Sequence, residues 1–219
     1  MEETLRDLMD GANPTVAPYA KLGECLVRVT AKGADEAECE ALMAPMVEEI
    51  CRRMGDRVYG LDADSLEERV LELLAEKNLS VASAESCTGG MIAQRLTAIP
   101  GASAYFKGGV TVYTEEAKTT LLGIEQKFID KHGVVSAAVA RRMAKRVRKL
   151  LGSDLGVGVT GWAGPDGDDV GLVFVALAAR GECYVRRLQL GRFDRERIRT
   201  VAAHSAFDMA RRWLTGLDI

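Results

Sequence analysis

The sequence has little of several residue types on which particular protein classes depend. Aromatic side chains make up only 5% of its 219 residues, which is few for a surface that stacks nucleic-acid bases. Five cysteines occur without any CxxC spacing and only two histidines accompany them, so neither a disulfide framework nor a structural zinc site is expected. A net charge of −3 gives no reason to expect a nucleic acid or an anionic membrane as partner.

Long apolar runs are also missing. The longest, around Leu172 to Ala179, is far shorter than the roughly 20 residues that span a bilayer. The acidic start, Met1 to Asp7, lacks the basic and apolar regions of a signal peptide. We therefore expect a soluble, reduced, cytoplasmic protein that does not contact a membrane.

What the chain does contain is typical of a globular protein. Hydrophobic residues make up 47% and charged residues 28%, and 22 glycines indicate many tight turns.

The N-terminal part of the sequence predicts a small β-α-β unit. Cys25–Thr30 alternates as a strand does, apolar residues three and four apart indicate a helix over 34–54 that Pro45 kinks or divides, and Arg57–Tyr59 indicates a short returning strand.

A domain boundary follows this unit. The polar turn Leu61–Asp64 precedes a capping box that Ser65 opens, so we expect a small domain at 1–62 and a second domain at 63–219. Strands and helices then alternate, which predicts a three-layer α/β/α sandwich whose sheet is mixed but mostly parallel. The expected strands lie near 79–84, 110–114, 155–160, 171–179 and 184–189, and the expected helices near 90–98, 115–122 and 136–151 and after Asp194.

The turn at Ala84–Gly90 is the first candidate site, because small residues between a strand and a helix leave free N–H groups that attract anions. Ser86 and Thr88 offer hydroxyls and Cys87 a thiol. The alternative is a plain glycine turn with a capping serine. A cysteine nucleophile is disfavoured because neither histidine has a local signature that links it to Cys87.

A lysine supplies the second candidate. Lys118 falls one turn into a helix that follows a strand, and a partly desolvated lysine can lose its proton near neutral pH and act as base to a serine. The alternative is a solvated surface lysine. Tyr113, at the strand end, is a half-buried packing residue unless a pocket forms there.

Two further segments carry polar or glycine-rich turns. Thr160–Gly167 follows a strand but matches neither a Walker loop nor GxGxxG, and its Trp162 either stacks on a ring or covers the core. Gly191–Arg195 precedes the last helix, and its arginines are suited to a phosphate or carboxylate.

Taken in order, these segments resemble the C-terminal domain of the CinA family from about Ser65 to Leu214. That domain carries an ESCTGG turn, a GSSxxF-type segment, a Y-S-N-E-A-K segment, an AVS-type helix start and a TG-x-AGP turn. The matching residues here are Glu85–Gly90, Gly101–Phe106, Tyr113–Lys118, Val134–Ser136 and Thr160–Pro165.

The N-terminal part of the sequence is similar to the small KH-like middle domain of the same family. The similar segments are Asn13–Lys21, Val29–Lys32 and Gly55–Gly60. The family's large N-terminal domain, related to molybdopterin-binding proteins, has no counterpart in this sequence, so the resemblance implies the back part of a larger architecture.

The resemblance implies a nicotinamide-nucleotide amidohydrolase, which converts nicotinamide mononucleotide and water to nicotinic acid mononucleotide and ammonia without a metal or cofactor. It implies a pyridine nucleotide as partner and a homodimer. Ser103 and Ser86 are both candidate nucleophiles with Lys118 as base, and the preference falls on Ser103. The implied substrate-binding residues are Thr88, Gly89, Gly90, Tyr113, Thr160, Gly161 and, for the 5′-phosphate, Arg195.

Departures from the family pattern keep alternatives open. Glu115 stands where the family has asparagine, and Ala102 replaces the first serine of the GSS segment. The glycine-rich stretch before Lys-Pro-Val-Gly is shortened to Asp166–Gly171, whose extra carboxylates oppose a phosphate by about 1 kcal/mol each. One alternative is therefore a catalytically impaired nucleotide-binding or interaction module. RNA binding is disfavoured because the KH-like segment contains no GxxG clamp.

Overall fold

The computed structural model describes all residues from 1 to 219 and divides the chain into two compact units, Met1–Leu61 and Asp62–Ile219. Each unit has its own apolar core. None of the helices is both long enough and apolar enough to cross a membrane.

The first unit is built on a two-stranded antiparallel sheet, not on the expected β-α-β arrangement. Strand β1 pairs with β2 so that Thr15 lies opposite Thr30. The returning strand expected at Arg57–Tyr59 is wrong, because the short turn at Gly23 lets β2 pair with its neighbour in sequence. The elements are α1 (Glu2–Met9), β1 (Thr15–Lys21), β2 (Glu24–Thr30), α2 (Glu36–Met54) and the 3₁₀ turn η1 (Gly55–Arg57).

The two helices of this unit pack their apolar side chains against the two-stranded sheet. Leu5 of α1, Val16 of β1 and Ile50 of α2 are buried together. Helix α2 is capped by the Asp35 side chain, which accepts the N–H of Glu38, and it runs through Pro45 as one element.

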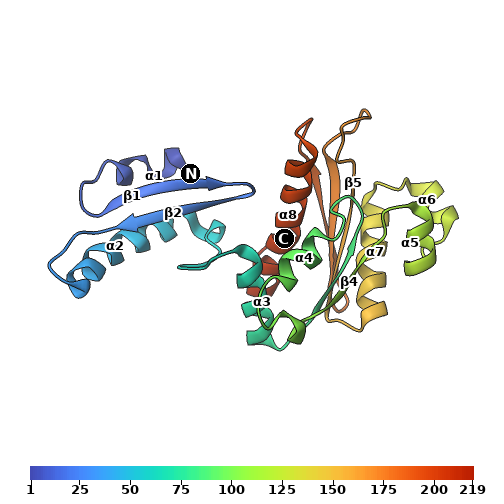
Figure 1. Cartoon of the computed structure of the whole chain (residues 1–219), viewed down its shortest axis with the longest axis horizontal. Coiled ribbons are helices and arrows are strands. Elements are labelled where there is room, and N and C mark those ends of the chain that lie inside the picture. The colour runs from blue at the N-terminus through green and yellow to red at the C-terminus, as the bar shows by residue number, and fades with distance from the viewer. The chain divides into compact units, whose positions relative to one another are not determined.

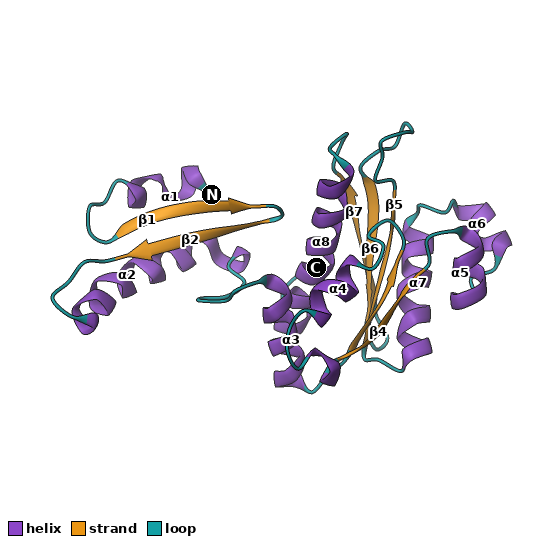
Figure 2. Ribbon diagram, viewed as in Figure 1, coloured by secondary structure: helices purple, strands orange, loops and turns teal.

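A five-stranded mixed sheet forms the second unit, as expected (Figure 2). The strand order is β4-β3-β5-β6-β7, with β3 parallel to β4 and β5, and with β6 antiparallel to both its neighbours. The strands are β3 (Val81–Glu85), β4 (Phe106–Thr111), β5 (Leu155–Gly161), β6 (Leu172–Ala178) and β7 (Cys183–Gln189).

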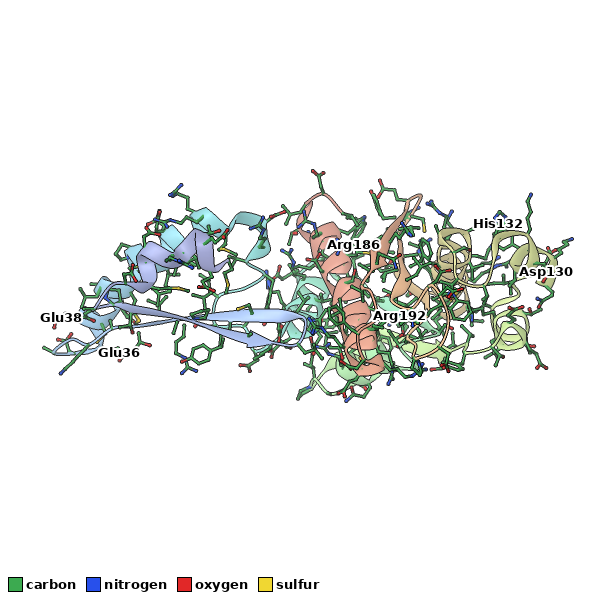
Figure 3. All side chains as sticks on the ribbon, turned by 90° about the horizontal axis from the view of Figure 1, so that it is seen from above. Glu36, Glu38, Asp130, His132, Arg186 and Arg192 are labelled. Atoms are coloured by element: carbon green, nitrogen blue, oxygen red, sulfur yellow. The ribbon has the colours of Figure 1, made fainter.

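Helices cover both faces of this sheet, which confirms the three-layer architecture (Figure 1). One face carries α3 (Leu66–Lys77), α4 (Met91–Thr97) and α8 (Arg195–Thr215), and the other carries α7 (Ala137–Leu151) with α5 (Glu115–Leu122) and α6 (Gln126–His132) beside it. Ser65 and Ser136 cap α3 and α7 as expected. Arg186 of β7, labelled in Figure 3, forms an ion pair of 2.9 Å with Asp208 that links β7 to α8.

Strand β4 begins and ends earlier than expected, and this matters for the site. It runs over Phe106–Thr111 instead of 110–114, because Gly108 and Gly109 belong to the strand. A Cβ on Gly109 would lie 2.5 Å from Oγ of Ser83 on β3, so the strand needs glycine for this close approach. Residues 112–114 are therefore a connection that leaves the carboxyl end of β4.

Candidate active site

The carboxyl ends of three parallel strands bring the candidate residues together. Ser86 follows β3 directly, and its N–H donates to the carbonyl of Val159 on β5 at 2.9 Å. Lys118 lies in the first turn of α5, whose N-terminus is capped by Thr114 through the N–H of Ala117 at 3.1 Å. Because adjacent parallel strands end at the same edge, both side chains point into the space above that edge.

Lys118 and Ser86 are in direct contact. The Nζ of Lys118 lies 3.0 Å from Oγ of Ser86 and donates a hydrogen bond to the carbonyl of Val112 at 2.8 Å. The lysine side chain is fully buried, and that burial lowers its pKa below the ordinary 10.5, whereas Cys87 and Glu115 oppose the shift. A neutral amine held by the Val112 carbonyl has a lone pair to accept the Ser86 hydroxyl proton.

The turn that carries Ser86 is fixed from both sides. The buried carboxylate of Glu85 accepts the N–H groups of Gly90, Ile92 and Ala93 at 3.0, 3.1 and 3.0 Å, and so holds the start of α4. Arg199 of α8 donates to the carbonyls of Cys87 and Thr88 at 3.1 and 2.8 Å. No backbone carbonyl accepts the N–H groups of Cys87 and Thr88, which face the Cys87 sulfur in this structure.

Arg199 was not among the residues expected from the sequence. It lies one helical turn after Arg195 on α8, and that spacing is the signal that could have pointed to it.

A cavity of about 300 Å³ opens above Ser86 and Lys118. Two half-exposed aromatic side chains, Tyr113 and Trp162, line it. Arg195 donates to the hydroxyl of Tyr113 and to the carbonyl of Gly164, both at 2.6 Å. The remaining lining residues are Cys87, Thr114, Glu115, Val134, Val135, Thr160, Gly161, Ala163 and Asp166.

Most of the expected site residues line this cavity, but not all. Ser86, Lys118, Tyr113, Thr160, Gly161 and Arg195 do so. Thr160 is buried, and its hydroxyl donates to the Val134 carbonyl at 2.9 Å. The turn residues Thr88, Gly89 and Gly90 do not line the cavity, and the N–H of Gly90 already donates to Glu85.

Ser103 lies elsewhere. It is an exposed residue of the 3₁₀ turn η2 (Ala102–Ala104), which precedes the amino end of β4. In the parallel pair Val81 is opposite Phe106 and Glu85 opposite Thr111, so Ser103 is at one end of the sheet and Ser86 at the other. A strand of this length spans about 15 Å. The structure thus brings Lys118 to Ser86 and not to Ser103.

The structure also disfavours Cys87 as a nucleophile. Its thiol is buried, and burial raises the pKa of Cys87 to about 11, so the reactive thiolate is disfavoured. Neither histidine lines the cavity with it. Cys87 is therefore a packing residue beside the Ser86–Lys118 pair.

Comparisons with known proteins agree with the two units. The model of the CinA C-terminal domain matches residues 63–214, and that of the damage-inducible protein CinA KH domain matches residues 1–60. A CinA-like protein from Desulfovibrio desulfuricans is 47% identical over 98% of this chain and 52% of its own length. A CinA-like protein from Dictyoglomus thermophilum is 44% identical over 99% of this chain and 54% of its own length. The chain thus spans about half the length of these curated relatives.

Solved structures share the fold of the second unit. The competence/damage inducible protein CihA from Agrobacterium tumefaciens superposes with a TM-score of 0.65 at 34% identity, covering 69% of this chain and 95% of that chain. A CinA superfamily protein from Klebsiella pneumoniae superposes with a TM-score of 0.66 at 29% identity, covering 69% of this chain and 96% of its own. Because two family models cover both units almost end to end, the chain belongs to the CinA family.

Proposed function

We propose that this protein is a serine–lysine amidohydrolase that converts nicotinamide mononucleotide and water to nicotinic acid mononucleotide and ammonia. The observation that carries the proposal is the 3.0 Å contact between Nζ of Lys118 and Oγ of Ser86 in a cavity open to a small molecule. A hydroxyl nucleophile beside a desolvated lysine is an arrangement suited to acyl transfer. The resemblance to nicotinamide-nucleotide amidohydrolases supplies the substrate.

In the proposed mechanism, neutral Lys118 removes the proton from the Ser86 hydroxyl as Oγ attacks the carboxamide carbon. The Cys87 and Thr88 N–H groups, which no backbone carbonyl accepts, stabilise the oxyanion of the tetrahedral intermediate. The ammonium of Lys118 then returns its proton to the leaving nitrogen, and ammonia departs from an acyl-serine. Water, deprotonated by the same lysine, then attacks this ester. The Lys118 ammonium returns that proton to the departing Ser86 oxygen, and the acid product loses its proton to solvent as the carboxylate.

Arg195 is the proposed anchor for the 5′-phosphate. Its guanidinium has five N–H donors, and the contacts with Gly164 and Tyr113 leave donors free for phosphate oxygens. Asp166 lines the same cavity, and its negative charge repels a phosphate. The phosphate is therefore expected to bind on the Arg195 side of the opening.

The test is ammonia release from nicotinamide mononucleotide by the purified chain, with the acid product identified by chromatography. Lys118→Ala is expected to reduce the rate by at least about 100-fold, as loss of a general base does. Absence of ammonia from the wild-type protein at high concentration would contradict the proposal. Calorimetry on the same samples separates the alternative, since binding without turnover identifies a nucleotide-binding module.

A further inference from the structure

Trp162 is presented to the cavity in an unusual way. It is the first residue after β5, and its backbone is held in both directions, with its N–H donating to Leu172 at 2.9 Å and its carbonyl accepting from Gly171 at 2.8 Å. Trp162 is nevertheless 46% exposed and lines the cavity above Ser86. The backbone of Trp162 is therefore held in place, while the exposed part of the residue lies at the cavity.

The indole of Trp162 is about half covered by the protein but forms no side-chain hydrogen bond and no ring stack. The other tryptophan, Trp213, by contrast donates its Nε1 to Glu182 at 3.3 Å. Leaving so large an apolar ring in water forgoes its burial, which makes an exposed indole at a cavity mouth informative. A flat ring bound in the cavity would cover the exposed part of the indole.

The charges around Trp162 point to the kind of ring. Asp166 follows four residues later in the same turn, and Glu115 lies at the start of α5, and both line the cavity. Neither carboxylate forms an ion pair, and the Glu115 carboxylate accepts only the side-chain amide of Gln126, at 2.7 Å. The two basic residues of the cavity wall have other partners, since Arg195 donates to Tyr113 and Gly164, and Lys118 contacts Ser86 and the Val112 carbonyl.

We propose that Trp162, with Asp166 and Glu115 in the lining of the same cavity, is a specificity-determining residue that selects a positively charged pyridinium ring over a neutral aromatic or aliphatic amide. The inference rests on the proposed amidase function and names the part of the substrate that is recognised. A ring nitrogen that carries a sugar is a permanent flat cation, and an indole face attracts such a cation by its quadrupole. The two carboxylates attract the same charge.

The experiment compares 1-methylnicotinamide with nicotinamide, because the two share a ring and a carboxamide and differ in charge. Calorimetry on the wild-type chain is expected to give a dissociation constant about 10-fold lower for the cation, the size of a partly desolvated cation–π contact. Trp162→Leu is expected to reduce this preference to less than about 3-fold, and Trp162→Phe to retain part of it. Asp166→Asn is expected to reduce it by about 2- to 3-fold, because an exposed charge is screened.

Fluorescence reports the contact itself. Trp213→Phe leaves Trp162 as the only tryptophan, and Trp213 belongs to the far end of α8, about 27 Å along the helix from Arg195. Quenching of Trp162 by 1-methylnicotinamide is expected to saturate at the calorimetric constant. In Trp162→Phe, where only Trp213 emits, quenching is expected to rise linearly without saturation.

The two hypotheses fail separately. If nicotinamide mononucleotide is hydrolysed while wild-type and Trp162→Leu proteins show the same preference, the ring-selection proposal is overturned and the amidase proposal stands. If the preference depends on Trp162 but no ammonia is released, the amidase proposal is overturned and ring recognition stands. Equal dissociation constants for both ligands in the wild-type chain also overturn ring selection.

Discussion

Nζ of Lys118 lies 3.0 Å from Oγ of Ser86, although 32 residues separate the two in sequence. The contact exists because β3 and β4 are parallel neighbours whose carboxyl ends lie at one edge of the sheet. Ser86 follows the first of these strands directly. Lys118 follows the second after a three-residue connection, 112–114, and a helix start that Thr114 caps.

The rate should rise with pH through the titration of Lys118. Burial lowers the pKa of the Lys118 ammonium, and only the neutral amine can accept the Ser86 proton. The plot of kcat/KM against pH is therefore expected to rise to a plateau with a midpoint below 10.5. A rate that falls with increasing pH across this limb would contradict Lys118 as base.

The same shift predicts how stability depends on pH. Because the pKa of Lys118 is lower in the folded chain than in the unfolded chain, the unfolded chain binds more protons between the two values. The free energy of unfolding should therefore rise with pH in that window. Lys118→Met removes this contribution, so the wild-type chain should gain stability relative to the variant as pH rises towards 10.5, as measured by urea unfolding at several pH values. A difference that does not change with pH would contradict the buried titration.

Arg199 is expected to act as a positioning residue. Its hydrogen bond to the Cys87 carbonyl orients the N–H of Thr88, which belongs to the same planar peptide group, and its hydrogen bond to the Thr88 carbonyl holds the next peptide of the turn. Arg199→Gln should lower kcat by about 10-fold with little change in KM, since each hydrogen bond to a charged group contributes about 1.5–3 kcal/mol and part is retained by glutamine.

Arg197 provides the matched control for that variant. It lies on the same helix, and its guanidinium covers the ring of Phe193, 3.8 Å from the ring centre, instead of reaching the turn. Arg197→Gln is expected to leave kcat unchanged. Equal losses in both variants would mean that Arg199 acts only through the stability of α8.

Arg195 should distinguish substrates with and without a phosphate. Arg195→Gln is expected to raise KM for nicotinamide mononucleotide by about 10- to 100-fold, the loss of a charge-assisted contact. The KM for the corresponding nucleoside should change by less than about 3-fold, because that substrate has no phosphate for the guanidinium to bind. A similar rise for both substrates would show that Arg195 only supports Tyr113 and Gly164.

The regular parts of the second unit were predictable because each carries a local signal. Ser136 before α7 and Gly152 after it mark both helix ends, and Gly181 marks the hairpin. Other elements lack such a signal. Strand β1 contains Pro18, which an edge strand tolerates because its missing N–H is not needed for pairing. Strand β4 contains two glycines, Gly108 and Gly109, which are depleted in strands and so hide the strand from a reading of the sequence.

The candidate site was predictable as a set but not in its internal pairing. Sequence order indicated that Ser86, Lys118 and Arg195 come from strand ends or helix starts, where sites in α/β folds form. The choice between Ser86 and Ser103 depends on which end of β4 each residue occupies. That became visible only with the register of β3 against β4 and the earlier start of β4.

The identity of the nucleophile tests the account most directly. Ammonia release from nicotinamide mononucleotide should be compared in the wild-type chain, Ser86→Ala and Ser103→Ala, with circular dichroism to show that all three are folded. We expect Ser86→Ala to lose at least about 1000-fold in kcat, and Ser103→Ala, exposed on η2, to remain within about 2-fold of the wild type. An active Ser86→Ala protein, or an inactive but folded Ser103→Ala protein, would contradict the Ser86–Lys118 mechanism.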